Sequence, residues 1–307
     1  MKILLTGASG MVGCNLLLAA GAQEYEWLAP GRSELNLLDA VATNSYIVRH
    51  KPDLIIHAAG RVGGIHANLN APVRFMLDNL DMGRNVLEAA ALADVPRVLN
   101  LGSSCMYPRN RDGDLREEDL LTGELEPSNE GYALAKIVVA SLGRYMKQEN
   151  SGLSCKTLVP SNLYGPYDKF DPSHSHLIAA VIHKLHMAKI EGRESVEIWG
   201  AGEVRREFLF VGDLAKALLK AVSEFDSLPD LMNIGLGRDY TVNEYYQSAA
   251  EVVGYRGRFE HDQSKPAGMR RKLCNIDRAR AWGWTPEVSL KQGLQSTYDY
   301  YLALLGE

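Results

Sequence analysis

The chain has 307 residues and a mass of 33.9 kDa, which suits one large domain or two closely joined ones. Its net charge of −5 and isoelectric point near 5.9 argue against a nucleic-acid surface, and no apolar stretch is long enough to span a membrane. The four cysteines form no Cys-x-x-Cys pair, so we expect no disulfide framework, no metal site and a reducing cytoplasm.

The first predicted element is a buried parallel strand, Lys2–Thr6, which is a short apolar run. Glycines in Gly-x-x-Gly-x-x-Gly spacing follow at once, and a helix is predicted over about 11–20. Glycines between a strand and a helix allow close approach to a pyrophosphate, which the helix N-terminus then binds. We therefore favour a dinucleotide site over a glycine-rich turn without a ligand. The residues predicted to contact the cofactor are Gly7, Gly10, Met11, Val12 and Gly13. Because the strand begins at residue 2, we expect no signal peptide ahead of it.

The second predicted strand, near 25–29, is followed by Arg32 rather than by an acidic residue. An acid here would bind the ribose hydroxyls of NAD, whereas an arginine attracts the 2′-phosphate of NADP. We therefore favour NADP(H), although the same arginine is also compatible with an ordinary surface charge. Asp39 is a candidate contact to the adenine edge, and equally a candidate N-cap of a helix over 40–50.

Strands and helices then alternate along the chain, which predicts an α/β fold with a doubly wound parallel sheet. The further strands are predicted at 53–57, 97–101 and 155–159, and the helices at 73–93 and from Tyr132 to about 150. After Asn162 the pattern loosens, which indicates a smaller domain over the carboxyl ends of the strands. We expect residues 1–163 and about 207–237 to form the nucleotide-binding domain, and 164–206 and 238–307 the substrate-binding domain.

Tyr132 and Lys136 are the most informative pair in the sequence. They stand four residues apart, so they share one face of the predicted helix. A lysine charge beside a tyrosine favours the phenolate and brings its pKa toward the working range of an acid–base catalyst. The alternative is a solvated helix face, since this spacing alone is common.

With Ser103, this pair resembles the Ser/Tyr/Lys triad of the extended short-chain dehydrogenase/reductase family, which binds NAD(P) on a Rossmann fold. Other segments narrow the resemblance to the GDP-L-fucose synthase branch of that family, over essentially the whole chain. These segments are 62–65, 102–108, 160–166, 175–176 and 206–209.

The resemblance implies 3,5-epimerisation and NADPH-dependent 4-keto reduction of GDP-4-keto-6-deoxy-D-mannose to GDP-L-fucose. A ketone at C4 acidifies the hydrogens at C3 and C5, and cysteine and histidine can titrate near neutral pH. By resemblance, Cys105 would be the base and His176 the acid of both epimerisations. Ser103 and Tyr132 would hold the C4 oxygen, and Tyr132 would protonate it with Lys136 lowering the tyrosine pKa.

The resemblance also implies the remaining binding residues and a homodimer built from the long helices near 73–93 and 131–149. Further cofactor contacts would be Ala58, Ala59, Lys136, Pro160, Asn162, Leu163 and His176. Substrate contacts would be Asn162, Lys184, Trp199, Arg206 and Lys272, the last two at the diphosphate.

Each of these assignments has a plainer alternative. Cys105 also suits a small buried hydrophobe, and Trp199 a core position. His176 also suits a solvated position in a loop. A zinc site built on His174 and His176 would lack the further ligands that it needs. As isolated cations, Arg206 and Lys272 would be ordinary surface charges.

Three departures from the pattern of the branch are visible. Ser9 replaces an arginine that helps to bind NADP in some members, so Arg32 and Arg61 would carry more of that role. Residues 168–171, Ala267 and Arg270 differ on the substrate side. They keep open a related epimerase or 4-reductase acting on another GDP-4-keto sugar, a 3,6-dideoxy sugar or a heptose.

An alternative of another class is a non-catalytic NADP-sensing regulator on the same fold. Such a regulator would be expected to lose the Tyr132 and Lys136 pair, which this chain keeps.

Overall fold

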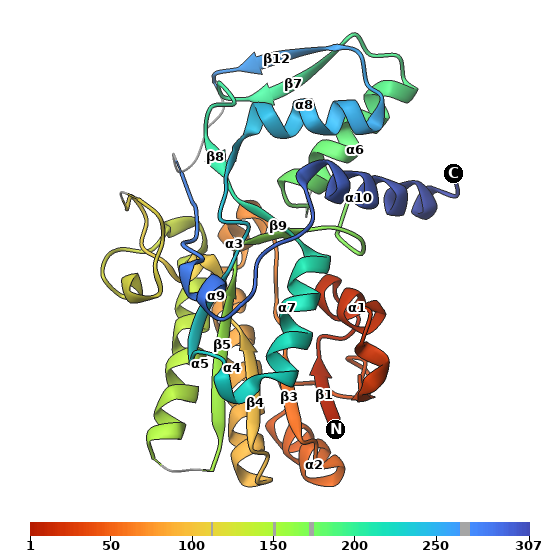
Figure 1. Ribbon diagram of the computed structural model, residues 1–307. Coiled ribbons are helices and arrows are strands. Elements are labelled where there is room, and N and C mark those ends of the chain that lie inside the picture. Colours follow the sequence, from red (N-terminus) through yellow and green to blue (C-terminus); the bar gives the residue numbers. More distant parts are fainter. Residues whose placement is uncertain (112, 150–151, 172–174, 265–270) are drawn as a thin grey trace.

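The structure is a computed structural model that describes residues 1–111, 113–149, 152–171, 175–264 and 271–307. Its centre is a six-stranded parallel sheet in the order β10-β5-β4-β3-β1-β2 (Figure 1). The strands are β1 (Lys2–Thr6), β2 (Glu26–Leu28), β3 (Leu54–His57), β4 (Arg97–Leu101), β5 (Ser154–Pro160) and β10 (Leu231–Ile234). The predicted doubly wound parallel sheet is confirmed, and its sixth strand, β10, is an addition to the prediction.

Helices cover both faces of this sheet. The helices of one face are α1 (Met11–Leu18) and α7 (Val211–Ser223); those of the other are α2 (Ala40–His50), α4 (Pro72–Leu92) and α5 (Glu130–Gln148). Side chains of β1 alternate between the two faces: Ile3 and Leu5 enter the cluster under α1 and α7, and Leu4 enters the other. This burial on both sides explains why the strand is apolar throughout rather than alternating.

The strand order reverses beside β1, which places a crevice at the carboxyl ends of the sheet. β2 pairs with one edge of β1 and β3 with the other, so the connections after β1 and β3 diverge. Ligands of open α/β sheets bind at such a switch point.

A smaller part of the molecule stands at this carboxyl end (Figure 1). It packs α6 (Leu177–Ile190), α8 (Val242–Val253) and α10 (Leu290–Leu305) with the strand pair β7 (Ser195–Trp199) and β12 (Arg258–Asp262) around a second apolar core. Two further strand pairs lie between the parts: β6 (Asn162–Tyr164) with β9 (Phe208–Phe210), and β8 (Arg205–Arg206) with β11 (Tyr240–Thr241). The predicted domain boundaries fall in or beside these pairs and stay a prediction.

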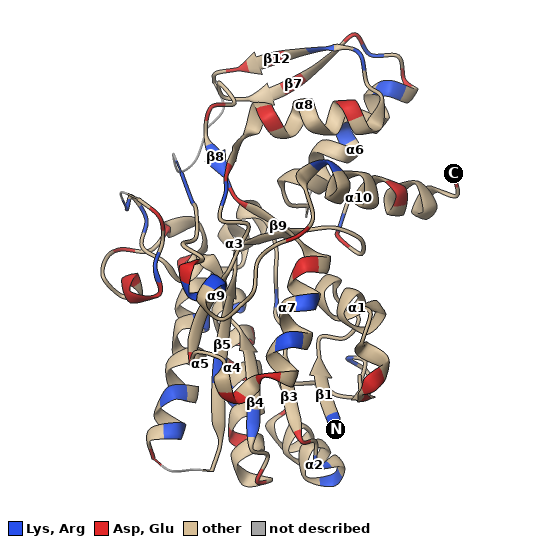
Figure 2. Ribbon diagram, viewed as in Figure 1, with Lys and Arg blue, Asp and Glu red and all other residues tan. Residues whose placement is uncertain are grey.

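The remaining elements are short. They are α3 (Ile65–Asn70), α9 (Asp277–Ala281) and the 3₁₀ turns η1 (Ala22–Glu24), η2 (Ser104–Met106), η3 (Glu117–Asp119), η4 (Pro127–Asn129) and η5 (Phe225–Ser227). Charged residues of both signs are spread over both parts of the molecule (Figure 2). In the described part of the chain, no helix has the length and apolarity that crossing a bilayer requires. Among those same residues, no group of three or more His, Cys, Asp or Glu side chains could hold a metal ion, and all four cysteines are free thiols.

Candidate active site

The loop between β1 and α1 and the first turn of α1 are packed so tightly that only glycine fits at one position in each. Gly7 has φ of +74°, and a Cβ there would come within 2.7 Å of the Ala59 nitrogen. A Cβ on Gly13 would come within 2.4 Å of the Gly7 oxygen. Helix α1 begins at Met11 after Gly10, which has no side chain to cap the first turn. This close backbone with a free helix N-terminus fits a dinucleotide pyrophosphate.

Hydrogen bonds hold the end of β3 against the end of β1, next to the β1–α1 loop. The Thr6 hydroxyl lies 2.9 Å from Nδ1 of His57 and accepts a hydrogen bond from the Ala59 nitrogen at 3.2 Å. Burial, with Lys136 nearby, lowers the pKa of His57 to about 3, so the imidazole is neutral. The loop therefore holds Ala58 and Ala59 beside Gly7, where the cofactor was predicted.

The residues predicted near the 2′-phosphate and the adenine edge have separate surroundings. Arg32 is exposed just after β2. Asp39 caps α2, accepting a hydrogen bond from the Ala42 nitrogen at 3.0 Å, which is the alternative that needs no ligand. The Arg61 guanidinium lies 2.6 Å from Asp78 of α4. Arg61 is thus already paired, and a role for it at a phosphate requires that pair to open.

Ser103, Tyr132 and Lys136 meet between the end of β4 and the start of α5. The Ser103 and Tyr132 hydroxyls form a hydrogen bond. The Lys136 ammonium donates to the Leu101 carbonyl at 2.9 Å and lies 6.0 Å from the centre of the Tyr132 ring. The three side chains are therefore assembled as the resemblance implied.

The tyrosine pKa differs from the prediction. Burial is the largest cause, and together with Cys105 nearby it raises the pKa of Tyr132 above its ordinary value, whereas the Ser103 hydrogen bond lowers it. Burial also lowers the pKa of Lys136 to about 8. Desolvation is thus the dominant effect, so Tyr132 is a protonated group that can donate its proton.

Cys105 lies in η2, directly beyond β4, and is half-buried. Its backbone nitrogen donates to the Ser103 hydroxyl at 3.3 Å. Its sulfur accepts a hydrogen bond from Nδ2 of Asn129 at 3.1 Å and lies 3.7 Å from Nζ of Lys272. The thiol is thus placed beside the triad with polar groups at its sulfur, unlike a cysteine that only fills a core.

His176 stands at the N-cap of α6, where the smaller part meets the crevice. Burial, with Lys169 nearby, lowers its pKa from the ordinary 6.5. The loop that includes Gly64 lies against it, since a Cβ on Gly64 would stand 3.6 Å from the Ser175 oxygen. A half-buried histidine in this place differs from the solvated loop residue that was the alternative. The neighbouring His174 lies outside the described residues.

The chain segments that carry two predicted substrate cations, Arg206 and Lys272, are joined through the buried carboxylate of Glu207. Glu207 directly follows Arg206, and its Oε2 accepts a hydrogen bond from the Cys274 nitrogen at 2.8 Å, two residues beyond Lys272. Burial raises the pKa of Glu207 to about 7. Arg206 is itself half-buried rather than a surface charge. Nδ2 of Asn162 donates to the Glu207 carbonyl at 3.4 Å, which ties β6 to the same junction.

Pro160 ends β5 and Leu163 lies in β6, so both flank this junction on the cofactor side.

Lys184 and Trp199 both contact Glu197 in the smaller part. Nζ of Lys184 donates to the Glu197 carbonyl, and Nε1 of Trp199 donates to the Glu197 carboxylate at 2.9 Å. Trp199 is 52% exposed, so it is not the core residue that was the alternative. The departures at Ala267 and Arg270 lie outside the described residues.

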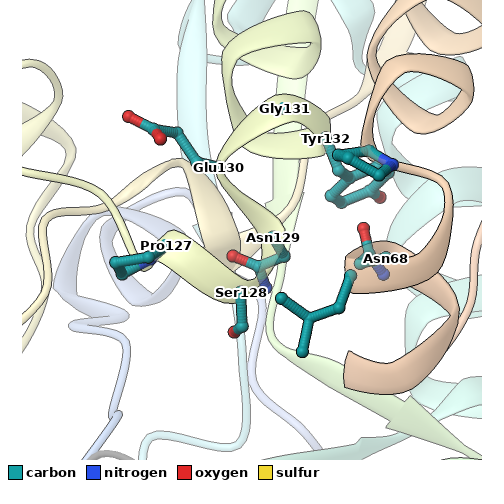
Figure 3. Close-up of a pocket in the computed structure, with 9 residues that line it drawn as sticks. Asn68, Pro127, Ser128, Asn129, Glu130, Gly131 and Tyr132 are labelled. Carbon is teal, nitrogen blue, oxygen red and sulfur yellow. The ribbon is translucent and has the colours of Figure 1, made fainter.

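A cavity of about 140 Å³ with a mixed polar and apolar lining opens beside Tyr132, between α3 and the start of α5 (Figure 3). Its lining includes Asn68 and Asn129, whose Oδ1 atoms are buried without a hydrogen-bond partner among the described residues. Asn68 also donates to the Gly63 and Gly64 carbonyls and so holds the loop that faces His176.

The sequence analysis did not identify Asn129 or Glu207 as site residues. Both stand inside segments that it did single out, immediately before the Tyr132 helix and after Arg206. Their contacts join segments that are far apart in the sequence, so no local pattern marks them.

The comparisons with known proteins now define the class. The family described as "NAD dependent epimerase/dehydratase family" matches residues 3–235, and the chain belongs to this family. This confirms the resemblance to extended short-chain dehydrogenases/reductases and the prediction of an NADP-dependent oxidoreductase and epimerase.

Individual relatives match over almost the whole chain. The GDP-L-colitose synthase of Yersinia pseudotuberculosis is 50% identical over 302 residues, which cover 98% of each chain. The GDP-L-fucose synthase of Azorhizobium caulinodans is 46% identical over 301 residues, covering 98% of this chain and 96% of the relative. The solved structure of a GDP-mannoheptose C4 reductase from Campylobacter jejuni with NADP bound superposes with a TM-score of 0.88 at 28% identity, covering 98% of both chains.

Proposed function

We propose that the chain converts GDP-4-keto-6-deoxy-D-mannose to GDP-L-fucose with NADPH, by epimerisation at C3 and C5 and reduction at C4. The observation that carries this proposal is the contact of Ser103 with both Tyr132 and the Cys105 backbone. One hydroxyl thereby places the proton donor of a reduction next to a candidate base for epimerisation. The relatives, a GDP-L-fucose synthase and other GDP-sugar enzymes, support the same substrate class.

Epimerisation uses this chain's own acid and base. The Cys105 thiolate takes the proton from the carbon next to the ketone, and the bonding electron pair moves onto the C4 oxygen. Ser103 and Tyr132 donate hydrogen bonds to that oxygen and stabilise the enolate. His176 then returns a proton to the opposite face of the carbon. Because the pKa of His176 lies below the ordinary 6.5, only a small fraction of the molecules carry it protonated at neutral pH, and these are the molecules in which it acts as the acid.

Reduction uses the same hydroxyl pair. NADPH, when bound along the β1–α1 loop, supplies the hydride for C4. Tyr132 gives its proton to the C4 oxygen, which its raised pKa permits because the group is protonated before the reaction. Lys136, held on the Leu101 carbonyl, supplies the positive charge that stabilises the tyrosinate left behind.

The nucleotide end of the substrate would lie toward the smaller part of the molecule. Half-buried Arg206 and Lys184 provide positive charge for the diphosphate, and the exposed indole of Trp199 provides an apolar face.

A second candidate substrate is a GDP-4-keto-3,6-dideoxy sugar, the class to which colitose belongs. The specific observation in its favour is that identity to the GDP-L-colitose synthase is 50%, against 46% to the GDP-L-fucose synthase named above. Lys169, one of the residues that differ from the expected pattern, lies near His176, so it would influence the epimerisations rather than hydride transfer.

The test is the product mass after incubation with GDP-4-keto-6-deoxymannose and NADPH in heavy water. A reduced GDP-sugar carrying two solvent deuteriums on carbon is expected, one each at C3 and C5. A reduced product without deuterium would make the chain a plain 4-ketoreductase and remove the roles of Cys105 and His176. Faster turnover of the 3,6-dideoxy substrate in direct competition would select the second candidate instead.

A further inference from the structure

The sulfur of Cys105 is approached by donors from two distant parts of the chain. Nδ2 of Asn129, just ahead of α5, donates to it at 3.1 Å. Nζ of Lys272, which lies between β12 and α9, is 3.7 Å from it. The resemblance assigned this lysine to the diphosphate, yet here it lies at the sulfur next to the triad. Neither donor is needed to fill space around a thiol.

The Asn129 side chain is oriented by its surroundings. Its nitrogen faces the sulfur, while its oxygen is buried without a hydrogen-bond partner among the described residues, at the cavity of Figure 3. Water in a cavity of this size can satisfy the oxygen, and in this orientation the amide N–H points at the sulfur. The amide therefore presents an N–H, which suits a sulfur that accepts rather than donates.

From this geometry we infer that Asn129 and Lys272 are positioning residues that hold Cys105 in its thiolate form. The inference rests on the proposed function, in which Cys105 is the base. Two N–H donors aimed at one sulfur leave a thiol proton poorly placed and give a thiolate two charge-assisted hydrogen bonds. The base is then ready before the sugar binds, and the C–H proton that it takes forms the S–H bond.

The other groups around the sulfur do not supply this stabilisation. Tyr132 on α5 is the further titratable group that faces Cys105, and it is protonated and neutral at neutral pH. The rest of the pocket is apolar, formed by Met106, Leu125, Ala133 and Ile137 with their neighbours. Among the described residues, the positive charge at the sulfur therefore comes from Lys272.

Alkylation of Cys105 by iodoacetamide tests the inference without any sugar. The rate is followed from pH 6 to 10 by the mass of the Cys105 peptide, so Cys14, Cys155 and Cys274 do not interfere. Asn129→Leu and Lys272→Met should each slow alkylation about tenfold at pH 7, the size expected for one hydrogen bond to a charged group. The rates should converge with wild type at high pH, where the thiol is ionised in every variant.

Matched variants distinguish an effect on the ionisation of the Cys105 thiol from an effect of side-chain shape. Lys272→Arg keeps the charge and should restore the wild-type profile. Ser128→Ala lines the same cavity but bonds Glu126, and it should alkylate as wild type does. Asn129→Asp keeps the side-chain shape and replaces the donor by a negative charge, so it should slow alkylation further, even if the leucine variant does not fold.

Three results would overturn the inference. Unchanged rates in both Asn129→Leu and Lys272→Met would show that neither donor acts on the thiol, and a change in only one would remove the other residue's role. Rates lowered by the same factor at every pH would show altered access rather than altered ionisation. Because alkylation needs no substrate, a chain that turns over no GDP-4-keto sugar would end the proposed function and leave this result standing.

Discussion

The pKa values of single residues at this site depend on burial as much as on neighbouring charges. A lysine four residues from a tyrosine predicts a lowered tyrosine pKa, but in the structure the pKa of Tyr132 is raised. The helix spacing predicted which side chains would meet. It could not predict how much water the folded crevice removes from them, because that depends on β4, η2 and α5 together.

Lys136 should set the high-pH limit of reduction. Burial lowers its pKa to about 8, so its charge is lost as pH rises through that value, and support for the tyrosinate is lost with it. Single-turnover NADPH oxidation should therefore slow above pH 8 in the wild type. Lys136→Met should be slower at every pH, by about a hundredfold. Lys136→Arg stays charged and should lose the high-pH decline. A decline that persists in the arginine variant would show that another group titrates.

Glu207 should make stability depend on pH. Its folded pKa of about 7 lies above its ordinary value of 4.5, so the neutral acid is the form that the fold favours. Its contribution is fully present below pH 4.5 and is lost as pH rises through about 7. Relative to Glu207→Gln, which does not titrate, wild type should lose up to about 3 kcal/mol of unfolding free energy between pH 4.5 and pH 8. Urea unfolding at the two pH values measures this, and a difference that does not vary with pH would contradict it.

At the scale of elements, the sequence predicted best where one buried strand or helix carries its own pattern. β1, α2 and β4 begin and end where they were expected. The elements that were not predicted include α3 and β10. β10 has four residues and exists because it pairs with β5, and α3 is a short turn held by Asn68, so neither has a local signal of its own.

The candidate site likewise has features that the local sequence predicts and features that depend on tertiary packing. The glycine loop and the Tyr132–Lys136 helix follow from spacing within one element. The contacts of Cys105 with Asn129 and Lys272 join residues 24 and 167 positions apart, so they exist only after these distant segments have packed together. Tertiary packing, rather than any motif, decides which polar group reaches the sulfur.

The β1–α1 loop offers a test of its close packing. A Cβ in Gly13→Ala would come within 2.4 Å of the Gly7 oxygen and 2.5 Å of the Ala8 Cα. Those are backbone atoms, so the loop must shift, which should cost about 1–3 kcal/mol of unfolding free energy. NADPH affinity, measured by fluorescence titration, should fall as well. The matched control is Gly31→Ala, whose Cβ would meet nothing within 4 Å. Wild-type NADPH affinity in Gly13→Ala would contradict the proposed pyrophosphate site.

For the whole molecule, the strand order and the smaller part together decide where chemistry can occur. The crevice beside β1 opens toward α6, and β6, β8 and β9 carry the chain between the two apolar cores. Residues far apart in the sequence therefore line one site, as Lys272 and Cys105 show. The face of the sheet covered by α2, α4 and α5 has exposed apolar side chains that the site does not explain.

A set of these exposed apolar side chains lies on α4 and α5, two helices that pack against each other. On α4, Val73 is 66% and Leu77 is 47% exposed; on α5, Val138 is 45% exposed. We propose that this face forms the homodimer, since exposed apolar side chains on two neighbouring helices are typical of an interface. Val138→Glu would then place a charge in both copies of a two-fold interface and should give monomers by light scattering. Val41→Glu on α2, which is 76% exposed, should leave the mass unchanged. A monomeric wild type, or a Val138→Glu protein that stays dimeric, would move the interface elsewhere.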